Sequence, residues 1–169
     1  MTDFVKASTT VVSPGRSQVE LERILRRYGA SGFGVQSDYE ARIIKVMFRV
    51  PDEPGSTASV PVRLEVSVEA VARAMGMFKP PQSWQAERKP STQQWERAER
   101  VAWRHLVLWV DAALSAATAG VQKISEAFLA HTLVRNEQGQ IMRVVEQMDA
   151  AAGGNWRALL PAPTQEVSQ

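Results

Sequence analysis

The sequence lacks cysteine and contains only two histidines among its 169 residues, which excludes several kinds of site. Without thiols the chain can form neither disulfides nor the thiolate ligands of structural zinc sites. His105 and His131 have no paired carboxylate at ligand spacing, so we expect structural roles for both. No catalytic constellation is recognisable either, and we expect a protein without metal, cofactor or enzymatic activity.

Long hydrophobic runs are also missing. No stretch of eighteen apolar residues occurs, and the N-terminus shows no signal-peptide pattern. Hydrophobic residues make up 44% of the chain and charged residues 22%, which is typical of a globular domain. These features predict a soluble cytoplasmic protein with no membrane association.

The net charge is only +2, but two segments concentrate the basic residues. Arg16 to Arg49 contains seven basic and four acidic residues, and Lys79 to Arg104 contains six and three. If the two segments meet in space, they form one electropositive surface of the kind that binds polyanions. The alternative is that these charges are scattered over the solvated surface.

The first helix is predicted from the stretch "SQVELERILRRYG". Ser17 and Glu20 have the spacing of a capping box, and an apolar stripe runs from Leu21 to Tyr28. Gly29 suits the left-handed position that ends a helix. We expect residues 1–16 to be a flexible N-terminus.

Three strands should follow, because the apolar residues then recur at every second position. One face of the second strand carries Ile44, Val46, Phe48 and Val50, and the other carries Lys45, Met47 and Arg49. A third strand alternates from Val60 to Val68, with Pro61 at its start or on a sheet edge. The segments predict an antiparallel meander with one buried and one solvated face.

The longest helix is predicted over residues 92–118, opened by a capping box at Ser91 and Gln94 and stopped by Gly120. A short helix over 69–78 and a mobile linker over 79–90 should precede it. A stripe from Trp95 to Trp109 defines its apolar side. Further apolar residues widen this arc and suggest an oligomer interface, formed by Trp103, Val107, Val110 and Leu114.

The remaining residues should form an auxiliary region. We expect a helical extension over 121–152, with short helices over 121–133 and 141–151 separated by the turn "RNEQGQ". The Gly- and Pro-containing tail, residues 153–169, offers Trp156 to Leu160 as a segment that could bind a partner protein. The fold class is therefore α+β, with an αβββα core over residues 17–120.

This order of elements resembles the single-strand DNA-annealing proteins of phage-type recombination. "ELERILRRYGASGFGVQ" is similar to their helix–turn–strand entry, "ARIIKVMFRV" and "VPVRLEV" to the next strands, and "WERAERVAWRHLVLWVDAALSA" to their long helix. The resemblance implies an oligomeric ring or filament, in the cytoplasm of a bacterial host, that binds single-stranded DNA. Lys and Arg would contact the backbone while the bases stay free for pairing.

The basic residues expected at this DNA-binding site are Lys45, Arg49, Arg63, Lys79, Arg88, Lys89, Arg97, Arg100 and Arg104. Two alternatives stay open. One is a non-enzymatic phage structural or regulatory adaptor that binds protein through the Trp-rich helix. The other is a module like the double-stranded RNA-binding domains, although Thr92 to Glu96 lacks the lysines that usually open their last helix.

Overall fold

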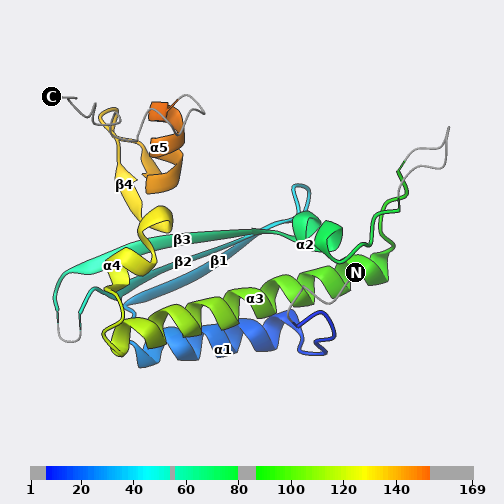
Figure 1. Cartoon of the computed structure of the whole chain (residues 1–169), viewed down its shortest axis with the longest axis horizontal. Helices are drawn as coiled ribbons and strands as arrows, with labels where there is room; N and C mark the ends of the chain where they lie inside the picture. Colours follow the sequence, from blue (N-terminus) through cyan, green and yellow to red (C-terminus); the bar gives the residue numbers. More distant parts are fainter. Residues whose placement is uncertain (1–6, 54–55, 80–86, 153–169) are drawn as a thin grey trace, which may run out of the picture.

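The computed structural model describes residues 7–53, 56–79 and 87–152, which fold into the α+β arrangement that the sequence predicts (Figure 1). The core contains one sheet and three helices, which are α1 (Pro14–Arg27), β1 (Gly32–Asp38), β2 (Ile43–Pro51), β3 (Ser59–Ser67), α2 (Val68–Ala74) and α3 (Thr92–Thr118). A smaller region follows, with α4 (Ile124–Ala127), a 3₁₀ turn η1 (Leu129–His131), β4 (Leu133–Arg135), β5 (Ile141–Arg143) and α5 (Val144–Ala152).

The sheet is an antiparallel meander in the order β1-β2-β3. Its register aligns Phe33 with Phe48 and Val46 with Leu64, so the apolar residues of all three strands share one face. In β2 the buried positions are Ile44, Val46, Phe48 and Val50, as the alternation predicts. Helices α1 and α3 cover this face, and the opposite face is contacted at β3 by α5 and is otherwise open in the described structure (Figure 1).

Helix α1 begins earlier than its sequence pattern suggests, and the predicted capping box at Ser17 is wrong. Ser13 is the N-cap, its Oγ accepts a hydrogen bond from the backbone N–H of Arg16, and Pro14 occupies the first turn. Proline fixes a helical φ and lacks an N–H that would need a partner there. Ser17 consequently lies inside the helix and is fully buried. The helix ends as expected, with Gly29 at φ +80°.

Helix α3 has the predicted bounds. Ser91 and Gln94 form the reciprocal capping box, and Gly120 follows the end of the helix with φ +75°. The proposed oligomer interface on this helix, however, is wrong. Trp103, Val107, Val110 and Leu114 are each at most 1% exposed within the subunit. The broad apolar arc is needed because α3 packs against α1, α2 and the sheet of its own chain.

The region after α3 is an arm that contains a β-hairpin, so the prediction of an all-helical extension is wrong in part. The turn "RNEQGQ" connects β4 to β5, and Gly139 adopts φ +80° within it. Strand β4 lies next to the edge of β3, where Thr132 bridges Val62. Phe128 anchors the arm, since it is fully buried and its ring centroid lies 5.5 Å from that of Phe48.

Some of the sequence predictions concern residues outside the described ranges, among them residues 1–6 of the expected flexible N-terminus and the tail, residues 153–169. The partner-binding segment Trp156 to Leu160 lies there, and so do residues 80–86 of the linker. The two ends of that linker are described, and the backbones of Lys79 and Arg88 pair with each other through two hydrogen bonds of 3.3 Å. Among the described residues, no helix is both long enough and apolar enough to cross a membrane.

Candidate nucleic-acid interface

The nine basic residues predicted to bind DNA do not share one surface. Lys45, Arg49 and Arg63 lie on the open face of the sheet, because their neighbours in the strand point into the core. Arg97, Arg100 and Arg104 belong to α3, which covers the other face of the sheet, and Lys79, Arg88 and Lys89 belong to the segment that precedes this helix. One continuous groove through all nine is therefore excluded by the layer structure.

Arg63 is part of an ion-pair network that holds the arm on the sheet. Its Nη2 lies 2.7 Å from Glu146 and its Nε 3.1 Å from Glu65, while Arg143 contacts both carboxylates. Burial alone would raise the pKa of Glu146, but hydrogen bonds from the backbone and side chain of Arg143 outweigh it and lower that pKa. The charge of Arg63 is neutralised locally, so we assign it to the arm.

Arg104 is also neutralised, and Arg97 has a different environment. Nη1 of Arg104 lies 2.7 Å from Glu20 of α1, and both side chains are partly buried. Arg97 instead donates two hydrogen bonds, of 3.1 and 2.9 Å, to the backbone carbonyl of Ser8. A carbonyl carries no net charge, so Arg97 keeps its full positive charge at an exposed position. Arg100 forms no ion pair with any residue that the structure describes.

Three cations gather in front of α3. Lys79, Arg88 and Lys89 line a pocket of about 330 Å³ together with Met77, Ser91 and Gln94. No ion pair joins these three side chains to a carboxylate in the described parts of the chain. The connecting residues 80–86, "PPQSWQA", contain no charged residue that could neutralise them. The first turn of α3 adds the partial positive charge of a helix N-terminus.

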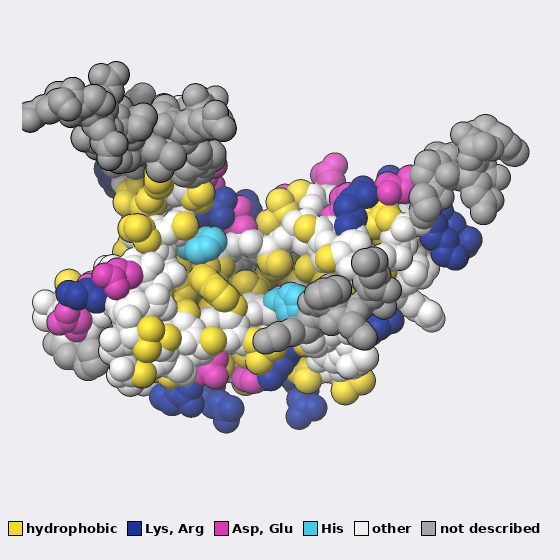
Figure 2. All heavy atoms as spheres, in the orientation of Figure 1, with side chains coloured by type: hydrophobic (Ala, Val, Ile, Leu, Met, Phe, Trp, Pro, Cys, Tyr) yellow, Lys and Arg dark blue, Asp and Glu magenta, His cyan; other side chains and the backbone are white. Residues whose placement is uncertain are grey.

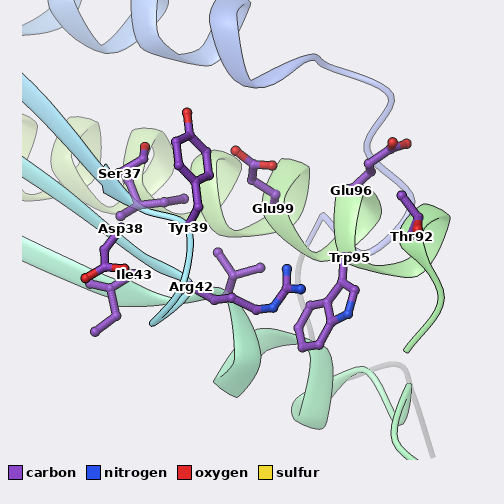
Figure 3. Close-up of a pocket in the computed structure, with 11 residues that line it drawn as sticks. Ser37, Asp38, Tyr39, Arg42, Ile43, Thr92, Trp95, Glu96 and Glu99 are labelled. Atoms are coloured by element: carbon purple, nitrogen blue, oxygen red, sulfur yellow. The ribbon is translucent and has the colours of Figure 1, made fainter. Parts of the chain in front are cut away.

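The carboxylates of α3 line a different pocket. Glu96 and Glu99 line a space of about 230 Å³ together with Trp95 and Arg42 (Figure 3). The guanidinium of Arg42 stacks 3.9 Å from the centroid of the Trp95 ring. Among the described ion pairs, none joins Glu96 or Glu99 to an arginine of the helix. The local carboxylates therefore do not cancel the helix arginines.

These placements define a basic strip that begins in the segment before α3 and extends onto the first turns of the helix. Gln94 lines the pocket in front of α3, and Arg97 and Arg100 follow it at intervals of three residues, so each is a neighbour of the one before it on the helix surface. The basic strip consists of Lys79, Arg88, Lys89, Arg97 and Arg100. None of its members has a carboxylate partner in the described structure. Such a row of unpaired cations can hold successive phosphates of one strand.

A second surface feature is a hollow between α3, β3 and the arm, which sequence reasoning did not find. His105, Trp109 and His131 line it, and the space-filling view shows the two histidine side chains on either side of apolar side chains (Figure 2). Burial lowers the pKa of His131, and the positive charge of Arg143 lowers it further. The hollow could not be deduced from the sequence because its walls come from three distant segments.

In the described ranges, no group of three or more His, Cys, Asp and Glu side chains is placed so that it could hold a metal ion. Comparison of the chain with family models, with curated proteins and with solved structures found no match.

Proposed function

We propose that this chain binds single-stranded DNA through phosphate contacts on the basic strip and, as a homo-oligomer, anneals complementary strands. One observation carries the proposal. Five cations lie in the segment before α3 and on the first turns of the helix, and none is paired with a carboxylate in the described structure. The proposal that the chain anneals strands as a homo-oligomer rests on its resemblance to phage-type annealing proteins. The assembly that this resemblance implies is a ring or filament.

The chemistry of the strip favours backbone contacts. Lysine and arginine neutralise phosphates irrespective of base sequence, and each contact releases a bound counterion. With five contacts, the logarithm of the affinity should fall with the logarithm of the salt concentration with a slope of about 3.5, at about 0.7 per single-strand phosphate. Bases that are not held by the protein remain free to pair with a complementary strand, which is the requirement for annealing.

A single strand fits the strip better than a duplex. The strip is one row along one edge of α3, extended by the pocket in front of the helix. A double-stranded RNA site must contact two backbones across a groove, so it needs cations on more than one element. The β1–β2 turn, which flanks the start of α3, instead presents Asp38, Tyr39 and Glu40. Acidic residues at that place disfavour a second phosphate backbone.

The test compares two double variants that remove the same charge. Arg97→Gln with Arg100→Gln removes two members of the strip, and Lys123→Gln with Arg135→Gln removes two exposed cations of the region after α3. Loss of two phosphate contacts should weaken binding about 25-fold at 0.1 M salt, because two contacts at about 0.7 each act over one decade of salt. The control should bind like the parent.

The binding assay uses fluorescent single-stranded oligonucleotides of three unrelated sequences, and annealing of complementary strands is followed in parallel. Equal losses for all three sequences, with a matching fall in annealing rate, are expected of the strip variant. Equal effects of the two double variants would refute the strip as the binding surface. Tighter binding of duplex RNA than of single strands would favour the second alternative.

The adaptor function has one specific observation in its favour. Leu108 and Trp109 are each 41% exposed on α3, and Trp109 lies in the hollow beside β3. Exposed tryptophan is common at protein interfaces. If the parent protein fails to bind single-stranded DNA even at low salt, this surface becomes the leading candidate and Trp109→Ala becomes the informative variant.

A further inference from the structure

Strand β1 is a sheet edge without the usual protection. In the described chain, β1 pairs with β2 on one side and with no strand on the other. It contains no proline, lysine or arginine, and its one charged residue, Asp38, stands at its end. Natural proteins usually protect such edges, because the free N–H and C=O groups recruit other strands. The opposite edge, β3, has Pro61 and is bridged by the arm at Val62.

The glycines of β1 have no evident purpose within the subunit. Neither Gly32 nor Gly34 has a left-handed φ. A Cβ atom at Gly32 would meet nothing within 4 Å, and one at Gly34 would meet only Cε of Met47 at 3.9 Å. Glycine weakens a strand, and in strand interiors it often marks the close approach of another chain. Both glycines face the open side of the sheet, together with Gln36 and Asp38.

We propose that β1 pairs antiparallel with β1 of a second copy, with Val35 on the two-fold axis. In this register Gly32 stands opposite Asp38 of the second copy, and Gly34 opposite its Gln36. On the other face, Phe33 stands opposite Ser37 of the second copy. Apart from Val35, which faces its own copy, each larger side chain thus faces glycine or serine, so β1 is complementary in volume to its own reversed copy.

The same register creates a pair of opposite charges. Gly32 aligns with Arg49 in β2, so Asp38 of the second copy, Gly32 and Arg49 form one row across three strands. The outer members of the row are about 10 Å apart at Cα, which is twice the spacing of strands. Because Gly32 has no side chain, Arg49 can extend over it toward the carboxylate. No ion pair engages Asp38 or Arg49 in the described subunit.

The pairing would also cover apolar surface that the subunit leaves half-exposed. Phe33 and Val35 contact the core but are only partly buried, because no strand lies beyond β1. In the dimer they would lie beside Ser37 and Val35 of the second copy. Two subunits would then share one six-stranded sheet. This inference goes beyond the proposed function, since it concerns β1 and Arg49 rather than the basic strip.

The experiment exploits the two-fold symmetry and is done without DNA. Sedimentation of the parent should show a species of twice 18.7 kDa at tens of micromolar. Asp38→Lys alone and Arg49→Glu alone each oppose like charges twice per dimer, so each should self-associate at least tenfold more weakly. An equal mixture of the two should restore dimers, because both contacts then join opposite charges. The chain carrying both substitutions should dimerise again.

Two further variants keep the test decisive. Glu40→Lys makes the same charge change in the adjacent turn, outside the strand, and should dimerise like the parent. Asp38 also accepts a hydrogen bond of 2.8 Å from the backbone N–H of Ala41, so Asp38→Asn tests the charge while keeping that acceptor. A monomeric parent would overturn the proposal. So would single variants that dimerise normally, or a mixture that stays monomeric.

Discussion

Replacing Ser17 with alanine is expected to stabilise the protein, although its sequence context suggests a helix cap. The side chain is fully buried inside α1, and its Oγ makes no hydrogen bond with any described residue. A buried hydroxyl without a partner costs about 1–3 kcal/mol. Alanine is also the better helix former, by about 0.5 kcal/mol. The lost Oγ contacts offset part of this gain, so we expect about 1–2 kcal/mol of added stability.

The assay is thermal and urea unfolding of Ser17→Ala beside Ser13→Ala. For a chain of this size, 1 kcal/mol corresponds to about 2–4 °C in Tm, so Ser17→Ala should raise Tm by about 2–8 °C. Ser13 is the true N-cap, and its loss should cost about 1 kcal/mol and lower Tm by about 2–4 °C. The opposite pattern, with Ser17→Ala destabilising and Ser13→Ala neutral, would refute the placement of the helix start.

Three further predictions concern the core and the arm. Trp103→Ala should lower the free energy of unfolding by about 3–5 kcal/mol in urea titrations, because the side chain is fully buried. The pKa of His131 is lowered in the folded protein, so the stability that its neutral form provides is present above the unfolded pKa of about 6.5 and is lost as the pH falls through the folded pKa. Urea unfolding between pH 8 and 5 should therefore show a smaller loss of stability for His131→Gln than for the parent. The pKa of Glu146 is lowered too, so the stability that its carboxylate provides is present above its ordinary pKa of 4.5 and is lost at lower pH. At pH 7, Glu146→Gln should therefore speed hydrogen exchange of the amides in β5 and α5, while exchange in the parent stays slow.

The core elements could be predicted from local patterns, because each residue's role there depends on near neighbours. The alternation in β2 gave the buried face directly, and the capping box at Ser91 marked the first turn of α3. The start of helix α1 was placed too late because Ser17 is followed by Glu20 at the spacing of a capping box, although Ser13 is the N-cap. Pro14 was the signal that could have decided between them.

The surface was harder to predict, since ion pairs join residues distant in the sequence. Arg63 and Glu146 are 83 positions apart, and Arg104 and Glu20 are 84 apart. A count of charges along the chain cannot tell which arginines such pairs neutralise. The apolar arc of α3 was misread for a similar reason, because a helix packed on several neighbours of its own chain has the same pattern as one at a subunit interface.

The dependence of binding on salt concentration shows whether the basic strip binds single-stranded DNA through phosphates. Affinity for an oligonucleotide is measured at several salt concentrations for the parent and for Arg97→Gln with Arg100→Gln. We expect a slope of about 3.5 for the parent and a slope smaller by about 1.4 for the double variant, at about 0.7 per contact. A parent that binds with no salt dependence, or slopes that coincide within error, would contradict this expectation.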